Sequence, residues 1–339
     1  MIPFSFFQLV KMNLRIIKAG ILDTIQDQGR YNYQHLGINP GGAMDKLSAQ
    51  VANFLVGNNG HQSIIELHFP ASEFFFEQPA LIAISGANFS ANVNGEEIPY
   101  LHPVLVSKYS ILQFHGLLTG ARAYLAVNGG FDIPKWLDSY STNLKAAEGG
   151  YKGRAFQKDD EIGIGTIAAF DSLLEKKEFY ILPWKADTGR ASIIDEEIKV
   201  LPGREWDRLT DKSKEKIFQQ SFTIASQSDR MGYRLKSEPL SMLNNGEIIS
   251  SAVSFGTVQL LPDGQLIVVM ADHQAGGYPR VAHVITAHLS RLAQMRPGER
   301  INFSMTDLKT AEELLIRQQQ HLQQLRNACT FRLSEYLKS

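Results

Sequence analysis

A long succession of short apolar segments, each bounded by turn-forming residues, is the feature that most constrains how this chain can fold. One group of such segments runs from residue 14 to residue 128, and a second runs from residue 161 to residue 303. Short segments at regular spacing are typical of β-barrels and β-sandwiches. The dipeptides Asn94-Gly95 and Asp263-Gly264 lie between apolar runs and predict tight type I′ hairpins. We therefore expect a mainly β protein.

Helices are expected at only a few places. Asp45 can cap a helix that ends at Gly57-Asn58, and shorter helices are predicted over 205–219 and 288–295. The longest predicted helix runs from about Asp307 to Ser334 and carries an apolar stripe along one side. Two interpretations of this C-terminal helix stay open. It packs on its own domain, or it forms an interface with another protein chain.

The length of 339 residues is too great for one small hydrophobic core and suits two domains. The boundary is expected between residues 166 and 195, because that stretch contains charged and polar segments without apolar periodicity. The expected organisation is an N-terminal extension, a first β-barrel, a linker, a second β-barrel and a C-terminal helical extension, at residues 1–13, 14–170, 171–195, 196–304 and 305–339.

Composition excludes several classes of function. A formal net charge of -1 gives no electrostatic reason to expect binding to nucleic acid or to an anionic membrane. No run reaches the roughly 18 apolar residues of a membrane span, and the apolar segment 1–10 lacks the features of a signal peptide. The single cysteine, Cys329, fits a reducing compartment, so we expect a cytoplasmic protein.

Two glycine-rich loops carry more polar side chains than a simple connection needs. Asp272 and Gln274 follow a predicted buried strand and precede Gly276-Gly277, while the loop after residue 26 places Asp27 and Arg30 among glycines. Glycine pairs let the backbone approach a ligand closely, and functional residues concentrate on loops of this kind. The two loops could converge on one site. The alternative is that each loop only satisfies its own polar groups.

The residue types in these loops suit a small polar acid or amide. Arg30 and Arg230 each offer two parallel N–H donors to a carboxylate. A glutamine side chain and backbone N–H groups can stabilise an amide oxygen, and an aspartate can accept an amide N–H or act as a base. A structural alternative remains for each residue. Asp27 and Arg30 can form a local ion pair, Arg230 beside Asp229 can face solvent, and Tyr278 can cover a barrel end.

Other common catalytic patterns are missing from the sequence. No spacing of histidine, cysteine and carboxylate residues suggests a metal site, so we expect no metal. There is also no phosphate-cradling loop and no nucleophile elbow. The chain therefore carries no self-sufficient motif for ATP chemistry.

Several motifs together resemble the biotin-dependent carboxyltransferase family, which is also called the allophanate hydrolase subunit 2 family. The resemblance covers about residues 14 to 303. The motifs that carry it include Gln26-Asp27-x-Gly29-Arg30, Pro40-Gly41-Gly42-Ala43-Met44-Asp45, Ser85-Gly86-Ala87-Asn88, Ser228-Asp229-Arg230-Met231-Gly232-Tyr233, Gly276-Gly277-Tyr278-Pro279 and Arg296-Pro297-Gly298. The chain departs from the family pattern at Gly41, where the family usually has serine. It departs again at Ala275, which stands where two threonines are usual.

The resemblance implies a fold of two cyclophilin-like β-barrels. The few helices and the long C-terminal helix are expected from the sequence patterns, and the extension beyond about residue 304 lies outside the resemblance. The resemblance also implies an ATP-dependent enzyme complex, because many stand-alone members are the C subunit of 5-oxoprolinase. That component works with a B subunit of related fold and a separate A subunit to open 5-oxoproline, a cyclic amide, to glutamate. Other members are the carboxyl-transfer part of urea carboxylase, or non-catalytic regulatory partners of a related-fold protein.

Under the 5-oxoprolinase hypothesis each candidate residue has an expected role. Arg30 or Arg230 would hold the substrate carboxylate, and Asp27 or Asp272 would receive the lactam N–H. The side chain of Gln274 and the Gly276-Gly277 backbone would stabilise the oxygen on which charge develops, beside Tyr278. ATP would be bound wholly or partly by a partner protein of the complex. Biotin would be needed only under the carboxyltransferase alternative, on a separate carrier protein and with a urea-like substrate.

Overall fold

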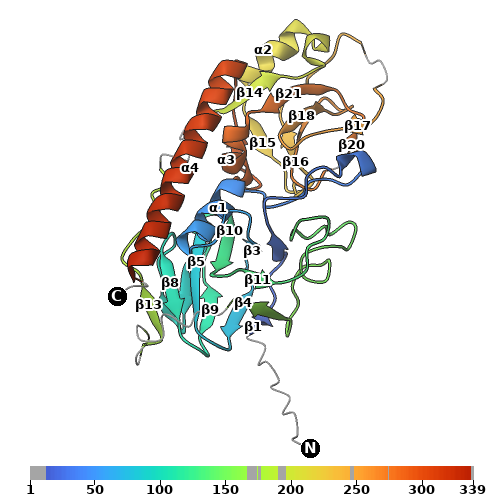
Figure 1. Ribbon diagram of the computed structural model, residues 1–339. Helices are drawn as coiled ribbons and strands as arrows, with labels where there is room; N and C mark the ends of the chain where they lie inside the picture. Colours follow the sequence, from blue (N-terminus) through green and yellow to red (C-terminus); the bar gives the residue numbers. More distant parts are fainter. Residues whose placement is uncertain are drawn as a thin grey trace, which may run out of the picture.

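The computed structural model describes residues 13–165, 174, 177–189, 196–244, 248–273 and 275–336 and shows two lobes with a long helix running along both (Figure 1). Strands are the dominant element, so the expected mainly β class is confirmed. The domain bounds expected from the sequence stay predictions. Most of the expected N-terminal extension and much of the expected linker lie outside the described residues.

The first lobe contains two antiparallel sheets. In a seven-stranded sheet the order is β11-β12-β1-β4-β9-β6-β7, and in a six-stranded sheet it is β13-β8-β5-β10-β3-β2. The bounds in the first sheet are β1 Asn13–Lys18, β4 Glu73–Phe76, β6 Ala91–Val93, β7 Glu96–Glu97, β9 Ile111–Phe114, β11 Phe131–Asp132 and β12 Glu161–Ile164. In the second sheet they are β2 Thr24–Gln26, β3 Ile64–His68, β5 Ala80–Asn88, β8 Pro103–Val106, β10 Thr119–Val127 and β13 Phe179–Ile181.

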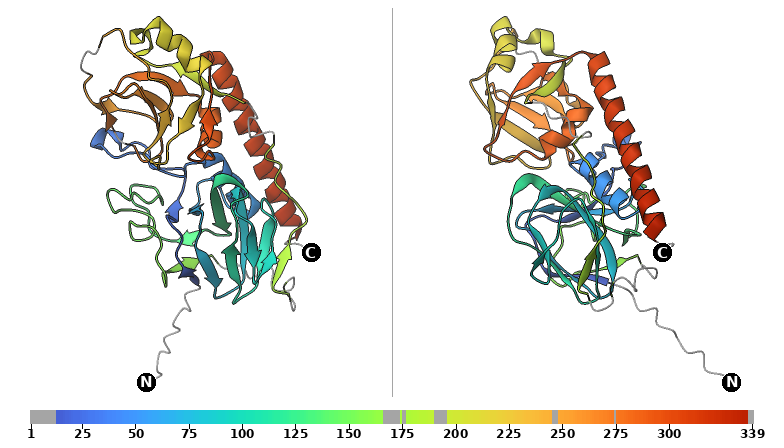
Figure 2. Two further views of the ribbon diagram at one scale, coloured as in Figure 1. Left: turned by 180° about the vertical axis from the view of Figure 1, so that it is seen from behind. Right: turned by 90° about the vertical axis from the view of Figure 1, so that its left-hand side faces the viewer.

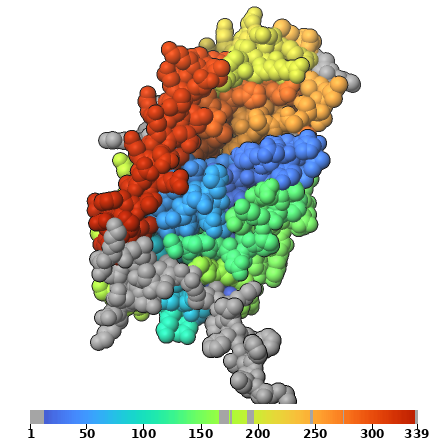
Figure 3. Space-filling model, in the orientation of Figure 1, coloured from blue at the N-terminus to red at the C-terminus, as the bar shows by residue number. Residues whose placement is uncertain are grey.

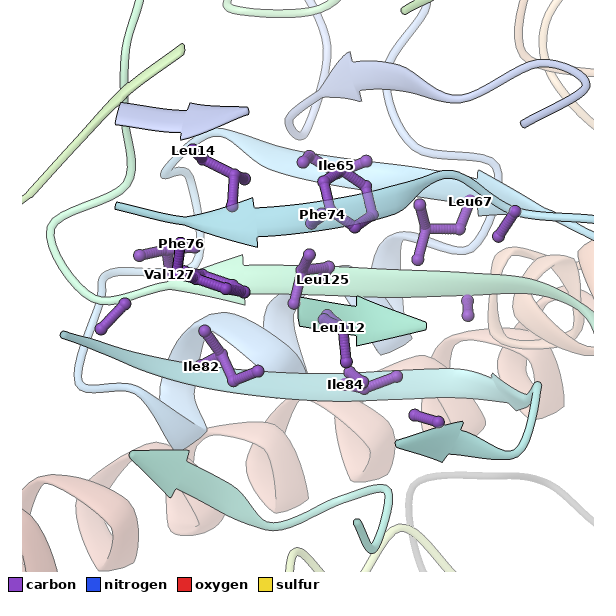
Figure 4. Packing of buried hydrophobic residues seen from close by; sticks show 14 of the residues in the cluster. Leu14, Ile65, Leu67, Phe74, Phe76, Ile82, Ile84, Leu112, Leu125 and Val127 are labelled. Carbon is purple, nitrogen blue, oxygen red and sulfur yellow. The ribbon is translucent and has the colours of Figure 1, made fainter. Parts of the chain in front are cut away.

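Strand β5 shows how the core of this lobe is layered. Because successive side chains of a strand point to opposite faces, Ile82 and Ile84 enter the core between the sheets, as Figure 4 shows. Leu81 and Ala83 point the other way, into a second apolar cluster beneath the helices. A strand buried on both faces needs the nearly continuous apolar sequence that β5 has.

The second lobe is built on one eight-stranded sheet, in the order β22-β15-β16-β19-β18-β21-β14-β23. The two edge strands, β22 and β23, are separated in the chain by only Asn302, so the sheet must curl until its edges nearly meet. A small two-stranded sheet of β17 and β20 lies beside it. The bounds are β14 Ile198–Pro202, β15 Phe222–Ile224, β16 Gly232–Lys236, β17 Ser251–Ala252, β18 Thr257–Leu260, β19 Leu266–Val269, β20 Ala275–Gly276, β21 Arg280–Val284, β22 Arg300–Ile301 and β23 Phe303–Met305.

Two helices join the lobes. Helix α1 (Lys46–Leu55) packs on the outer face of the six-stranded sheet, and α4 (Leu308–Tyr336) packs on α1 and runs along both lobes (Figures 2 and 3). The side chain of Asp45 accepts a hydrogen bond from the Ser48 N–H, which confirms the predicted cap of α1. The remaining helical segments are η1 Gln34–Leu36, η3 Trp206–Arg208, α2 Asp211–Gln219, η4 Thr286–His288 and α3 Leu289–Ala293. None of the described helices combines the length and apolar character required to cross a membrane.

One of the two predicted hairpin turns differs from expectation. Asn94 and Gly95 both have positive φ angles, 52° and 89°, so the type I′ prediction is confirmed there. Gly264 has a positive φ of 80°, but Asp263 does not. The Leu261 N–H donates to the Gln265 carbonyl, so the loop between β18 and β19 is longer than a two-residue turn. An Asp-Gly pair fits both loop types, and the local sequence does not separate them.

Candidate functional site

A cavity of about 690 Å³ lies between the two lobes and is bounded on one side by α4. The first lobe contributes the loop around residues 28–41 and the start of α1, and the second lobe contributes segments 252–257 and 270–273. This volume lies within the ordinary range of small-molecule sites, about 300–1,000 Å³. Both loops singled out from the sequence therefore reach one hollow.

The Asp27 carboxylate is held inside the first lobe by a dense set of hydrogen bonds. Its Oδ1 accepts from the Gly29 N–H and the Ser139 hydroxyl, each at 2.7 Å, and from the Ser141 hydroxyl. Its Oδ2 accepts from the Tyr140 N–H at 2.7 Å. These bonds tie the loop that follows β2 to the segment 139–141. Asp27 is thus engaged within the protein, and its catalytic role stays a prediction.

Arg30 is buried next to this segment, with only 1% of the residue exposed. Its Nη2 donates to the Ser141 carbonyl, and its guanidinium carbon lies 4.6 Å from the centre of the Trp136 ring. Within the described part of the chain, Nε and Nη1 find no hydrogen-bond partner. Buried polar groups are normally hydrogen-bonded. A guanidinium left in this state is an arrangement that a bound anion would complete.

The unpaired side of Arg30 faces Gly41, a residue that lines the cavity. A Cβ atom at Gly41 would lie 3.2 Å from Arg30 Nη1 and 3.9 Å from Asp272 Oδ1. The absence of a side chain at this position therefore leaves space between a buried cation and a carboxylate of the second lobe. Burial lowers the pKa of Arg30, while Asp27 and Asp272 act in the opposite direction.

Arg230 has its own partners in the protein. Nε and Nη2 donate to the two oxygens of Asp272 at 2.8 and 3.0 Å, Nη2 also donates to the Gly42 carbonyl at 2.8 Å, and Nη1 pairs with Glu66. Burial disfavours the charged form, but Asp272 and Glu66 raise the pKa of Arg230 above its ordinary value. The guanidinium fork is thus already used by Asp272. Binding of a substrate carboxylate by Arg230 stays a prediction, and Arg30 has more free donors.

Glu66, on β3, is the first-lobe end of this ion-pair chain and is fully buried. Its Oε2 accepts from the Met44 N–H at 2.8 Å and from the Tyr124 hydroxyl at 2.9 Å. Burial alone would raise the pKa of Glu66, but Arg230, assisted by His68 and Arg122, holds it below its ordinary value. The carboxylate is therefore ionised, and it links the two lobes.

A second polar bridge crosses the lobes beside α1. The Gln294 amide donates to Asp45 Oδ2 at 2.8 Å and to the Arg122 carbonyl at 2.9 Å. Arg122 Nη1 donates to the Tyr233 hydroxyl and to the Ala293 carbonyl, both at 2.6 Å. Sequence reasoning assigns no role to Glu66, Asp45 or Arg122 in this interface. The motifs that contain these three residues are visible in the sequence, but no local pattern shows which residues of the other lobe they contact.

Residues of the loop after β19 line two different hollows. His273 lines both the interlobe cavity and a second hollow of about 730 Å³ on the second lobe. Tyr278, which is 43% exposed, lines the second hollow. Gly276 packs closely on Gln259, since a Cβ there would lie 2.6 Å from Nε2. Gln274 lies outside the described residues. The substrate contacts expected of Gly276, Gly277 and Tyr278 stay predictions.

The interlobe cavity has a positive lining. Among the described residues that line it, none is an aspartate or glutamate, while Lys46, Arg204 and Arg280 are cationic. The chain as a whole carries a formal net charge of -1, so this local excess is not a general property of the surface. A concave site lined by one sign of charge concentrates ligands of the opposite sign.

A family model described as carboxyltransferase domain, subdomain A and B, matches residues 36–305. The chain belongs to this family. Asp27, Gly29 and Arg30 precede the matched range, which ends before α4 begins.

Named relatives within this carboxyltransferase family fall into two groups. The chain is 35% identical over 305 residues to the 5-oxoprolinase C subunit of Haemophilus influenzae, an alignment that covers 89% of this chain and 94% of that protein. It is 29% identical over 333 residues to urea amidolyase of Saccharomyces cerevisiae, covering 92% of this chain and 18% of that protein. The crystal structure of the Kluyveromyces lactis urea amidolyase superposes with a TM-score of 0.83 at 24% identity, covering 95% of this chain and 20% of that one, and shows the same fold.

Proposed function

We propose that this chain is the C subunit of an ATP-dependent 5-oxoprolinase, which opens the lactam ring of 5-oxoproline to give glutamate. The observation that carries the proposal is the 35% identity to the 5-oxoprolinase C subunit of Haemophilus influenzae, which extends over 94% of that relative. The cavity adds chemical support, because its described lining is cationic and lacks carboxylates, as a site for an organic acid requires.

Arg30 and Asp272 are the residues we assign to the substrate, which would reach them past Gly41, since neither residue itself lines the cavity. The unpaired Nε and Nη1 of Arg30 would hold the carboxylate of 5-oxoproline through the gap at Gly41. Asp272 is oriented by the Arg230 fork, so its remaining lone pairs can accept the lactam N–H. Gln274 and the Gly276-Gly277 backbone keep their proposed role at the lactam oxygen.

ATP enters this proposal as a substrate of the assembled complex. The sequence has no phosphate-cradling loop, so we place the nucleotide with the two partner proteins, the A and B subunits. When bound, ATP supplies the phosphoryl group that makes amide hydrolysis favourable. The cationic, carboxylate-free lining of the interlobe cavity is compatible with that phosphoryl group. This chain would hold the amide substrate and contribute to its activation only in the complex.

The test is to co-express the chain with its A and B subunits and to measure ATP hydrolysis and glutamate release that both depend on 5-oxoproline. Arg30→Gln should reduce kcat/KM by roughly 100-fold, since two hydrogen bonds to a charged group are lost at about 1.5 kcal/mol each. The matched control is Arg154→Gln, whose ion pair with Asp160 lies on the same lobe outside the cavity. A stably assembled complex without turnover would contradict the proposal.

A second candidate function is a component of a biotin-dependent carboxyltransferase. It is favoured by the match to the carboxyltransferase model and by the 29% identity to urea amidolyase. The apolar side chains of Leu47, Leu289 and Leu322 beside polar amides in the cavity fit a biotin ring, which a separate carrier protein would deliver. Activity of the purified complex that avidin does not inhibit would count against this candidate.

A further inference from the structure

The second-lobe side of the interlobe cavity carries a cationic site centred on Arg280, the first residue of β21. The guanidinium fork of Arg280 is held by Glu205, with Nε donating to Oε2 at 3.1 Å and Nη2 to Oε1 at 3.0 Å. The Arg280 backbone N–H donates to the same carboxylate at 2.9 Å. Glu205 therefore fixes the orientation of Arg280. The Nη1 edge makes a long contact, 3.4 Å to the Ser251 hydroxyl, and keeps donor capacity for a ligand.

A second guanidinium shares this carboxylate. Arg204 Nε lies 3.8 Å from Glu205 Oε1, and the Arg204 side chain is 80% exposed. Both arginines line the cavity, whereas Glu205 is buried behind them. Two cations balanced by one carboxylate leave a net positive charge on the cavity wall. This charge is positioned by the fold, because Glu205 N–H also donates to the Arg280 carbonyl at 3.0 Å.

A chain of hydrogen-bonding groups adjoins the two arginines. His283 Nδ1 lies 3.3 Å from the Thr257 hydroxyl, which lies 3.2 Å from the Ser254 hydroxyl. All three residues line the cavity, and His283 and Thr257 are cross-strand partners on β21 and β18. Burial and the nearby Arg280 lower the pKa of His283, so its ring is neutral near pH 7. A neutral imidazole accepts at one nitrogen and donates at the other.

The geometry of the available donors distinguishes between kinds of anion. A planar carboxylate is best matched by the two parallel N–H bonds of an arginine fork, but the Arg280 fork already binds Glu205. The remaining donors belong to separate side chains: the exposed Arg204 guanidinium, the Nη1 edge of Arg280, the His283 ring and the Thr257 and Ser254 hydroxyls. Donors from several residues that line one cavity suit a tetrahedral group with three or four oxygens.

We propose that Arg204, Arg280, His283, Thr257 and Ser254, here called the Arg280 cluster, bind a phosphoryl group. This site is separate from the Arg30 guanidinium, which we assign to the substrate carboxylate. Glu205 is a positioning residue of the cluster. The inference rests on the proposed function only for the source of the group, which is a phosphorylated form of the substrate. Free inorganic phosphate presents the same chemistry.

The binding test uses the isolated full-length chain and calorimetric titration at low ionic strength. Inorganic phosphate should show one saturable site, and acetate, a planar anion, should bind at least tenfold more weakly. Arg280→Gln should weaken phosphate binding at least tenfold, because a charge-assisted hydrogen bond is lost. Arg204→Gln, at an exposed position that tolerates substitution, should weaken it several-fold. The control Arg296→Gln removes a surface ion pair with Glu299 on the same lobe and should leave binding unchanged.

Three results would overturn the Arg280 cluster: no saturable phosphate binding, equal affinity for acetate, or undiminished binding in both arginine variants. A loss of phosphate binding in Arg30→Gln as large as that in Arg280→Gln would show that the two anion sites are not separate. If phosphate binds as described but the assembled complex does not turn over 5-oxoproline, the cluster stands and the proposed function fails. Turnover without phosphate binding by the chain would support the proposed function and overturn the Arg280 cluster.

Discussion

Replacement of Arg230 by methionine should destabilise the protein strongly, because two buried or partly buried carboxylates would lose their common cation. Glu66 is fully buried on the first lobe, and the Asp272 side chain on the second lobe is 17% exposed. The Arg230→Met variant keeps the length and apolar stem of the side chain but leaves both acids uncompensated. The Gly42 carbonyl also loses its donor.

The expected magnitude follows from the burial of the two acids. Removing one partner of a buried ion pair costs about 3–5 kcal/mol, since the remaining charge stays in a low-dielectric site. Asp272 can regain some water, so most of the penalty falls on Glu66. Arg230 now holds the pKa of Glu66 low, and that contribution is present above the ordinary carboxyl pKa and is lost as pH falls. The difference between wild type and variant should therefore be larger at pH 7 than at pH 4.

The assay is urea unfolding followed by circular dichroism and by tryptophan fluorescence, because two probes reveal whether the lobes separate before either unfolds. Lys216→Met is the matched control: its partner Glu238 is 74% exposed, so a loss of no more than about 1 kcal/mol is expected. Adding Glu66→Gln to Arg230→Met should recover part of the loss. A loss in Arg230→Met no larger than in Lys216→Met, or no recovery in the double variant, would refute the reasoning.

Three further outcomes follow from the structure. Gly42→Ala should cost at least about 2 kcal/mol, because φ is +91° and a Cβ would lie 2.8 Å from the Gly29 nitrogen. Gly37→Ala, at φ +76° with open space, should cost about 1 kcal/mol in the same urea titration, and equal losses would contradict the close packing at residue 42. Burial raises the pKa of Asp23 from 3.8 to about 6, so the folded state binds this proton more tightly and loses stability as pH rises through that interval. Asp23→Asn should therefore gain roughly 2 kcal/mol relative to wild type between pH 4 and pH 7, and a constant difference would show that Asp23 does not titrate in this way. Burial raises the pKa of the Cys329 thiol to about 11, so a thiol reagent at pH 8 should label the native chain far more slowly than the chain in urea. Similar labelling rates would mean that the packing of α4 does not protect the Cys329 thiol from the reagent.

The sequence predicts several elements of this fold from local signals, although the Asp263-Gly264 loop shows that a local signal is not always sufficient. Asn94-Gly95 requires two positive φ angles and forms the expected turn, and Asp45 caps α1 as its position indicates. The C-terminal helix, expected over about 307–334, spans Leu308–Tyr336. In each case the determining residues are neighbours in the chain, so backbone preference and periodicity are sufficient.

The candidate site is less predictable because its partners are distant in sequence. The sequence singles out Arg230, yet the pairing of Arg230 with Glu66 spans 164 positions and no local pattern reports it. The apolar stripe of α4 indicates packing, but it does not show that Leu322 also lines a cavity. Tyr278 and Gly276 belong to one motif, and only their placement shows that Tyr278 faces the second hollow. Tertiary contacts decide these features.

Because α4 follows both lobes in the chain, the wall of the cavity that it forms is synthesised after the other walls. Gln28 and Leu322 line the same hollow, although nearly the whole described chain lies between them. During synthesis both lobes precede α4, and its 29 residues take roughly 1.5 to 6 seconds to add at the usual rate of about 5–20 residues per second. Until then the hollow lacks one wall. Ligand contacts made by Leu315, Gln318 or Leu322 can therefore form only after both lobes have been synthesised.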